Sequence, residues 1–431
     1  MQVEKSEVES KVMQVIHSIV DNWNEEIEDD ITTESLLVED IGFASIDFVQ
    51  LSVEIEKKFD CKLGFQELLM QQGAYVEDLS VQQIVDFVHI KIHQADSVPV
   101  EKVQSKQVLL VIDEAERITA EKIQQFKKII KPLAHRENNT TEKNAPVGFI
   151  LSPPRSGSTL LRIMLAGSPQ LFVPPELHLL SYNDMAQRKQ ALNDEQNNHL
   201  LEGAIRGLMQ LRGWNSEQAR QFVADCEDRA LSCKQFYKMM QSTMGSRILV
   251  DKTPSYAFKL DILKRAEEDF ESAMYIHLTR HPCGTIRSYE ESKLTRLTPF
   301  MEASGFSGRQ LAEMVWLTSH QNILEFAQLI PKERFISLSY EDLVTNPKQQ
   351  LLRICQFLNI EFHEDMLNPY ENNEKRMAGG ADVVSKMSGD LKFHLHQEVD
   401  PSAATRWQQF YSEDMLGDLT KETAAKFGYI N

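Results

Sequence analysis

The segment VGFILSPPRSGSTLLRIML, at residues 147–165, constrains the fold of this chain more than any other. An apolar run of strand length ends at Ser152, a tight loop follows, and an apolar helix is expected to begin near Ser158. A strand, loop and helix in this order point backbone N–H groups and the positive end of the helix at one spot. The segment therefore predicts an anion-binding site at the carboxyl end of a strand.

Three further apolar runs of strand length are each followed by a loop and a helical segment. They are RILV, MYIHL and RFISL, which begin at residues 247, 274 and 334. This alternation predicts an α/β domain over residues 146–431, in which helices cover both faces of a parallel sheet.

The anion loop carries donors that suit a tetrahedral oxyanion. Arg155 supplies a positively charged guanidinium group with several N–H donors, and Gly157 lets the backbone approach the ligand closely. The nucleotide-binding pattern GxxxxGK[ST] is not met, because no Lys follows Gly157 and Ser152 stands where the first Gly would be. A second strand end, in MYIHLTRHPCGTIRSYEES, adds Arg280 and, eight residues later, Ser288. The two strand ends predict two neighbouring anion sites.

Charge divides the chain into unequal parts. Of the net charge of −18, residues 1–95 hold −14, from 20 acidic and 6 basic side chains. Apolar residues recur at helical spacing within 8–20, 46–59 and 81–92, so an all-α four-helix bundle is expected here. Its acidic surface repels nucleic acid and attracts basic proteins. Residues 96–145 are expected to form a linker that is partly helical.

The chain lacks the sequence signals of export and of metal binding. No apolar run approaches the ~20 residues of a membrane helix, and the charged start MQVEKSEVESK is not a secretory signal. Five Cys are scattered without a CxxC pair or a zinc-like spacing. We therefore expect a cytoplasmic protein with reduced thiols, no metal, no membrane segment and no nucleic-acid partner.

Together, the two strand ends resemble the sulfotransferases that use 3′-phosphoadenosine-5′-phosphosulfate as the donor, over about residues 146–410. SPPRSGSTLL is similar to their 5′-phosphosulfate loop, in the branch with Arg in place of Lys, and RHPCGTIRS is similar to their 3′-phosphate element. The resemblance implies that these residues bind the donor: Arg155, Ser156, Gly157, Ser158, Thr159, Arg280 and Ser288.

Further segments resemble the tyrosyl-protein and polyketide branches of that family. DKTPSY is similar to the segment whose Lys, here Lys252, contacts the transferring sulfuryl group. SYEDLVTNP is similar to the segment with an adenosine-contacting Tyr, here Tyr340. LKFHLHQEVDPSAATRW is similar to the loop that closes over the nucleotide with a basic residue, here Arg406. The resemblance implies metal-free catalysis in which Arg155 and Lys252 stabilise developing negative charge.

Two residues compete for the role of general base. Glu176, in LFVPPELHLL, matches the catalytic Glu of the tyrosyl-protein branch. His320, in MVWLTSHQNILEF, lies on a predicted apolar helix and is expected to titrate near neutrality. We expect both to act on the hydroxyl, one as the base and one orienting it. The alternatives are an ion pair for Glu176 and a core histidine for His320, and His178 is expected to be structural.

The N-terminal segment DIGFASIDFVQL, at residues 40–51, resembles the signature of acyl carrier proteins. In that family a Ser at the start of the second helix receives 4′-phosphopantetheine, and Ser45 holds this position. The preceding residue is usually Asp and here is Ala44. A plain helix N-cap is the alternative interpretation of Ser45.

A carrier joined to a sulfotransferase resembles the curacin-type and olefin-forming polyketide synthases. The resemblance implies sulfonation of a β-hydroxyl on a carrier-bound acyl chain, followed by thioester hydrolysis and loss of CO2 and sulfate. The expected partners are a phosphopantetheinyl transferase, upstream polyketide or fatty acid synthase modules, and a separate thioesterase. The alternatives are sulfonation of a free small-molecule hydroxyl, a P-loop kinase, and an acidic docking module joined to an inert domain.

Overall fold

The computed structural model describes residues 4–21, 30–95, 116–130, 133, 142–193, 198–292, 305–371 and 398–430, without residues 42, 44, 62, 66, 67, 69, 72, 73, 76 and 77. The chain divides into two compact units, each described on its own below. The first comprises Met1–Glu116 with Gln408–Met415, and the second comprises Arg117–Trp407 with Leu416–Asn431.

Helices with a common apolar core build the N-terminal unit. They are α1 (Lys5–Asp21), α2 (Ser45–Phe59) and α4 (Val81–Ala95), beside a short antiparallel hairpin of β1 (Met70–Gln71) and β2 (Ala74–Tyr75). Ile16 of α1, Ile55 of α2 and Ile84 of α4 are fully buried in this core. The apolar stripes of the sequence therefore face one another, and the predicted helical N-terminal region is confirmed.

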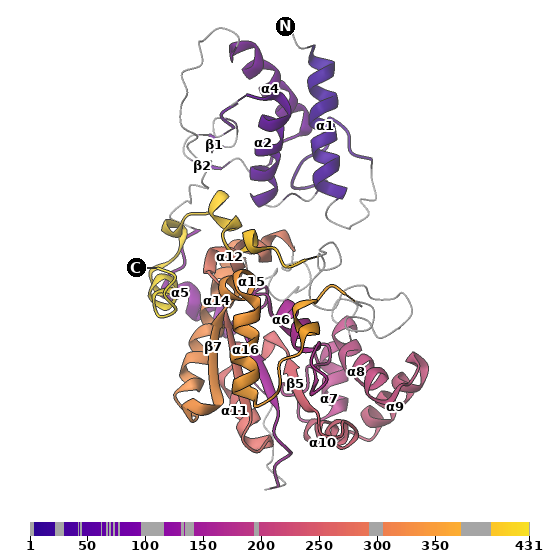
Figure 1. Ribbon diagram of the computed structural model, residues 1–431. Helices are drawn as coiled ribbons and strands as arrows, with labels where there is room; N and C mark the ends of the chain where they lie inside the picture. The colour runs from indigo at the N-terminus through magenta and orange to yellow at the C-terminus, as the bar shows by residue number, and fades with distance from the viewer. Residues whose placement is uncertain are drawn as a thin grey trace. The chain divides into compact units, whose positions relative to one another are not determined.

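A five-stranded parallel sheet forms the centre of the large unit (Figure 1). Its strand order is β4-β5-β3-β6-β7, and its members are β3 (Gly148–Leu151), β4 (Leu171–Phe172), β5 (Ile248–Lys252), β6 (Met274–Thr279) and β7 (Phe335–Ser339). Within the central strand β3, Ile150 is paired with Lys252 on one side and with Ile276 on the other. This register brings the carboxyl ends of three strands to one edge, and it confirms the predicted α/β fold.

Helices cover both faces of the sheet, because side chains alternate along each strand. Phe149 joins one apolar core with Ile323 of α14, whereas Ile150 joins the other with Leu161 of α6. The helices are α5 (Ala120–Ile129), α6 (Ser158–Leu165), α7 (Met185–Leu192), α8 (Glu202–Arg212), α9 (Ser216–Asp228), α10 (Cys233–Thr243), α11 (Leu260–Asp269), α12 (Pro282–Glu291), α14 (Gly308–Ala327), α15 (Tyr340–Thr345), α16 (Pro347–Leu358) and α17 (Asp418–Ala425). Shorter 3-10 helices of this unit are η2 (Asn198–Leu201), η3 (Pro254–Phe258), η4 (Lys332–Arg334), η5 (Glu364–Leu367) and η8 (Pro401–Ala404). By sequence, η9 (Arg406–Gln409) belongs partly to each unit, and η10 (Glu413–Met415) belongs to the N-terminal unit.

The end of the expected linker is attached to the large unit. Asn144 is buried, and its N–H donates to the carbonyl of Asp269 at 2.7 Å. Its side-chain Nδ2 donates to the carbonyl of Lys234, also at 2.7 Å. These bonds fix the chain just before it enters β3.

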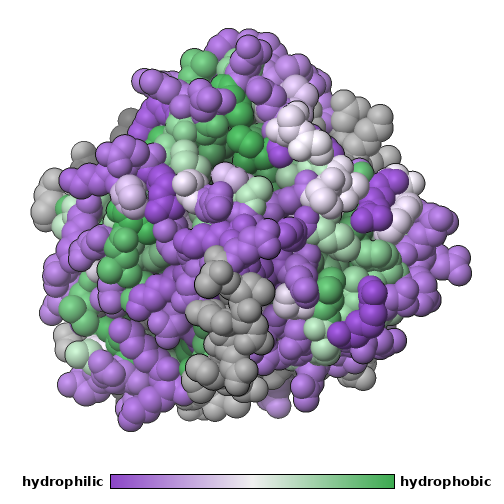
Figure 2. Space-filling view, turned by 90° about the horizontal axis from the view of Figure 1, so that it is seen from below, coloured by the Kyte–Doolittle hydropathy of each residue, from purple (hydrophilic) through white to green (hydrophobic). Residues whose placement is uncertain are grey.

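Hydrophilic side chains dominate the face shown in Figure 2, where hydrophobic ones gather in several separate patches. Among the described residues, no helix is both long enough and apolar enough to cross a membrane.

Candidate active site

The loop between β3 and α6 is shaped to receive an anion. Arg155 and Gly157 adopt left-handed backbone conformations, with φ of 64° and 85°, which is unfavourable for the arginine. α6 begins at Ser158, and no side chain in the described part of the chain caps its first turn. Its N-terminal N–H groups therefore point to the loop. The hydroxyl groups of Ser152 and Ser156 are buried and have no hydrogen-bond partner among the described residues. These orphaned hydroxyls fit a tetrahedral anionic group.

Residues of both predicted anion motifs meet at this loop. Arg155 Nε donates to Ser288 Oγ at 3.2 Å, and Arg280 Nη1 donates to the carbonyl of Arg155 at 2.8 Å. The guanidinium of Arg280 lies 4.3 Å from the ring centroid of Tyr340, a cation–π contact. The same ring covers Gly157, where a Cβ would lie 2.2 Å from Cδ2 of Tyr340. The structure therefore brings these five predicted donor-binding residues together, and it leaves room only for glycine at position 157.

A second cluster surrounds Glu176, on the loop after β4. Lys252 Nζ lies 2.5 Å from Glu176 Oε1 and 3.4 Å from Oγ1 of Thr159. His178 Nε2 lies 3.3 Å from the other carboxylate oxygen, Oε2. The side chain of Lys252 is 2% exposed and that of Glu176 is 20% exposed, so the ammonium is enclosed while the carboxylate borders solvent. The predicted residues Glu176 and Lys252 thus meet beside the first turn of α6.

Neighbouring charges keep Glu176 ionised. Burial by itself would raise the pKa of the carboxyl group, but the ammonium of Lys252 and the contact from His178 hold it well below its usual value. Arg162 of α6 adds a further cation, whose pKa burial lowers to about 10 against the opposing charge of Glu176. The site therefore holds a carboxylate among positive charges.

Sequence reasoning missed the residues that support this second cluster. The buried carboxylate of Asp251 accepts hydrogen bonds from Thr253 Oγ1 at 2.9 Å, from Tyr256 OH at 3.0 Å and from Tyr237 OH. Tyr256 OH in turn accepts from the N–H of Leu179 at 2.9 Å, on the loop of Glu176. The polar residues inside DKTPSY were a signal for this network, whereas nothing in the sequence pointed to Tyr237.

His320 lies on α14, on the sheet face opposite α6. Its Nδ1 is 3.0 Å from Nε2 of His277, whose Nδ1 is 3.2 Å from Ser337 Oγ. Burial, and then the charge of His277, lower the pKa of His320 well below its usual value. Its Nε2 has no hydrogen-bond partner among the described residues. The expectation that His320 titrates near neutrality is therefore wrong, and the structure joins it to His277 rather than to Glu176. Its part in catalysis stays a prediction.

Arg406 pairs within its own segment. Its guanidinium contacts the carboxylate of Asp400 and donates to Ser402 Oγ at 3.1 Å. The next residue, Trp407, stacks on His281 with ring centroids 3.8 Å apart. The segment thus lies beside the strand end that carries Arg280, although Arg406 itself points to Asp400. Residues 391–397 of the predicted closing loop lie outside the described residues.

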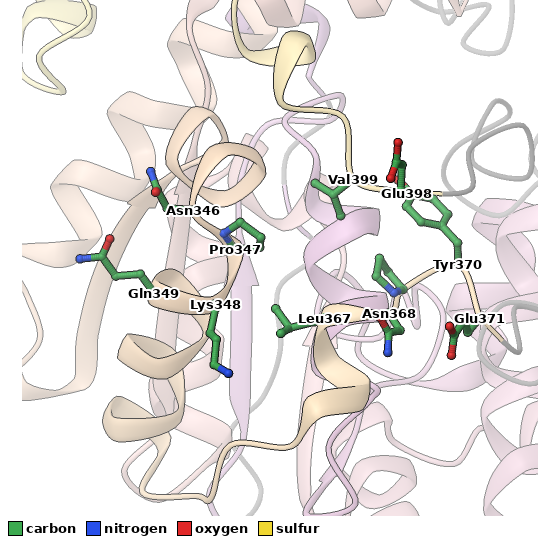
Figure 3. Close-up of a pocket in the computed structure, with 11 residues that line it drawn as sticks. Asn346, Pro347, Lys348, Gln349, Leu367, Asn368, Tyr370, Glu371, Glu398 and Val399 are labelled. Carbon is green, nitrogen blue, oxygen red and sulfur yellow. The ribbon is translucent and has the colours of Figure 1, made fainter.

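A separate pocket of about 530 Å³ opens at the first turn of α16 (Figure 3). Its lining comes from residues 346–349, 367–371 and 398–399. The lining includes neither Arg280 nor Glu176, so this pocket is separate from the anion loop and from the cluster around Glu176. Within the part of the chain that the structure describes, no three His, Cys, Asp or Glu side chains are grouped to hold a metal ion.

Comparisons with known proteins agree on the large unit. Residues 146–364, which include both clusters, match the model of the sulfotransferase family. The sulfotransferase domain from the curacin biosynthetic pathway is 37% identical, covers 67% of this chain and 99% of its own, and superposes with a TM-score of 0.61. The sulfotransferase domain from the Synechococcus PCC 7002 olefin synthase is 36% identical, covers 69% of this chain and 100% of its own, and superposes with a TM-score of 0.60. Protein-tyrosine sulfotransferase A of Caenorhabditis elegans is 22% identical over 290 residues, 66% of this chain and 67% of the relative.

Proposed function

The chain belongs to the sulfotransferase family, and we propose that it transfers a sulfuryl group from 3′-phosphoadenosine-5′-phosphosulfate to the β-hydroxyl of an acyl chain on a phosphopantetheinylated carrier domain. The observation that carries the proposal is the meeting of the two clusters at α6. Thr159 contacts Lys252, the partner of Glu176, while the loop just before it holds Arg155 and Gly157. An anion cradle, a cation and a candidate base therefore lie side by side.

The donor would be bound by the anion loop between β3 and α6 together with Arg280, Ser288 and Tyr340. The buried, unpartnered hydroxyls of Ser152 and Ser156, next to the uncapped start of α6, suit its phosphosulfate group. Arg280 and Ser288 would bind the 3′-phosphate, and Tyr340 the adenosine. The remaining donor contacts in this proposal are Arg155, Gly157, Ser158, Thr159 and Arg406.

The chain's own residues account for the chemistry. Glu176 accepts the proton of the acceptor hydroxyl while the hydroxyl oxygen bonds to sulfur and the bond from sulfur to the phosphate oxygen breaks. Lys252, Arg155 and the N–H groups of α6 stabilise the negative charge that builds on the leaving group. The donor, when bound, supplies the sulfuryl group. His320 is the second candidate for the base, because its Nε2 is unpaired among the described residues.

The proposal of a carrier-bound acceptor is supported by two observations. The two related domains come from the curacin pathway and from an olefin synthase, and Ser45 opens α2 in an acidic N-terminal unit. In this proposal a phosphopantetheinyl transferase loads Ser45 and synthase modules supply the acyl chain. A separate thioesterase then completes a decarboxylative termination.

Intact mass spectrometry of the full chain tests the proposal. The protein is treated with coenzyme A and a phosphopantetheinyl transferase, loaded with a 3-hydroxyacyl group, and then given the donor. We expect first the mass of phosphopantetheine and then that of one sulfuryl group. Transfer only to a free hydroxy acid would instead indicate a small-molecule sulfotransferase. Thermal stabilisation by ATP–Mg but not by 3′-phosphoadenosine-5′-phosphate would indicate a kinase.

A further inference from the structure

The loop of Glu176 makes several contacts with the segment 251–256. Lys252 contacts the Glu176 carboxylate at 2.5 Å, and Thr253 Oγ1 accepts from the N–H of His178 at 3.5 Å. Ser255 Oγ lies 3.3 Å from Nδ1 of the His178 ring. The segment that supplies Lys252 therefore also fixes both the backbone and the ring of His178.

The backbone of His178 is strained. Its φ is +50°, in the left-handed region, and its side chain is only 8% exposed. Residues with a Cβ rarely adopt this conformation, and they keep it where the surrounding structure fixes them, often at functional sites. Here the turn directs the ring back to the carboxylate two residues earlier, with Nε2 at 3.3 Å from Glu176 Oε2.

The main chain of Glu176 packs closely against helix α8. A Cβ at Gly203, in the first turn of α8, would lie 1.8 Å from the carbonyl oxygen of Glu176. Helix α8 can approach this closely only because position 203 is glycine. Oε1 of Glu176 contacts Lys252, and Oε2 faces Nε2 of His178 at 3.3 Å. This Nε2 is buried and has no hydrogen-bond partner among the described residues, so the ring stands beside the carboxylate oxygen that Lys252 does not contact.

We propose that His178 is a positioning residue that directs the carboxylate of Glu176 for proton transfer, and that Ser255 orients the His178 ring. The inference rests on the proposed function, in which Glu176 is the base. Proton transfer requires the accepting oxygen within hydrogen-bond reach of the hydroxyl, and contacts of this kind are often long before substrates bind and shorten in the reactive complex. A carboxylate left free to rotate would occupy the productive direction for only part of the time.

The test uses His178→Gly in the full chain, because glycine accepts the φ of +50° and leaves a space that imidazole can enter. We expect kcat to fall by up to about 100-fold, as for a misplaced catalytic group. The affinity for 3′-phosphoadenosine-5′-phosphate, measured by calorimetry, should be unchanged. Added imidazole should restore part of kcat in a saturable manner. Ser255→Ala should lower kcat less, and should have no further effect in the double variant.

The matched control is His363→Ala, which removes an exposed histidine 3.7 Å from the carboxylate of Asp365, outside both clusters. It should leave kcat and affinity unchanged. A wild-type kcat in His178→Gly overturns the inference, as does a loss of kcat that imidazole does not reverse. If His178→Gly fails to fold, a wild-type kcat in Ser255→Ala overturns it. If the wild-type protein itself transfers no sulfuryl group, the proposed function fails instead.

Discussion

Nε2 of His277 lies 3.0 Å from Nδ1 of His320, and both rings are fully buried. One nitrogen must donate and the other accept, so the two imidazoles share a single proton at this contact. Burial lowers the pKa of His277 to about 3, and the pKa of His320 also lies well below its usual value. The pair is therefore neutral at physiological pH, and it joins β6 to α14.

This neutral pair should make the folded protein sensitive to acid. Histidine in the unfolded chain titrates near pH 6.5, whereas folded His277 stays uncharged down to about pH 3. The unfolded state binds more protons between these values, so the free energy of unfolding should fall as the pH decreases from about 6.5. Urea unfolding at several pH values measures this slope. His277→Gln, which keeps a hydrogen-bonding side chain, should reduce the slope, and an unchanged slope would contradict the assignment.

Removing either candidate base should slow turnover. Glu176→Gln keeps the shape of the side chain but not its basicity, and we expect a loss of about 10²–10⁴-fold in kcat. His320→Ala should also lower kcat, and the double variant should be little worse than the poorer single variant, because both residues are expected to act on one hydroxyl. Single-turnover rates measure the effect, with nucleotide affinity as the control. A wild-type rate in His320→Ala would assign this histidine to the core alone.

The pH dependence of kcat should lack a step near neutrality. Lys252 and His178 hold the pKa of Glu176 well below its usual value against the effect of burial, and burial lowers that of His320. A lower pKa keeps either base deprotonated in mild acid, so kcat should stay level from about pH 8 to about pH 5. Short assays in this range, before acid unfolding, measure the profile. A decrease centred near pH 6.5 would show a base with the usual pKa of histidine.

Gly157→Ala should abolish tight nucleotide binding. The new Cβ would lie 2.2 Å from the ring of Tyr340, so the ring or the loop must move. Gly213→Ala is the matched control, because Gly213 also has a positive φ, 66°, and no described atom lies within 4 Å of its Cβ position. Gly213→Ala should lose about 1–2 kcal/mol of stability from its backbone conformation alone, and Gly157→Ala should lose at least as much. Only Gly157→Ala should lose affinity for 3′-phosphoadenosine-5′-phosphate, by more than about tenfold in calorimetry. Equal affinities of the two variants for this nucleotide would contradict a role of the close contact between Gly157 and Tyr340 in binding.

Ser45→Ala should prevent phosphopantetheine loading and leave nucleotide affinity unchanged. Ser45 and the donor-binding cluster belong to different compact units, so a change in one should not affect binding in the other. Intact mass after treatment with coenzyme A and a phosphopantetheinyl transferase measures the loading. A phosphopantetheine adduct on the Ala variant would show that the attachment site lies elsewhere.

The parallel sheet and the anion loop could be predicted from sequence because their signals are local. Apolar runs of strand length indicate strands, and the spacing of Arg155, Gly157 and Ser158 marks the turn into α6. The support of the site could not be predicted in the same way. Tyr237 reaches Asp251 from a helix, and Gly203 admits the backbone of Glu176, but neither residue stands in a recognisable pattern.

The sequence by itself determined the alternation of strands and helices along the chain and the position of the anion loop. It also determined which charged side chains, Arg155, Lys252 and Arg280, the motifs carry. Each of these features depends on residues only a few positions apart. Only the tertiary structure decided which distant side chains meet. It placed Lys252 on Glu176, 76 residues away, and His277 on His320, 43 residues away. Burial and partner charges set a pKa, and both arise from the packing of segments that no local pattern relates. For this reason the ionised Glu176 and the neutral His320 emerged only from the fold.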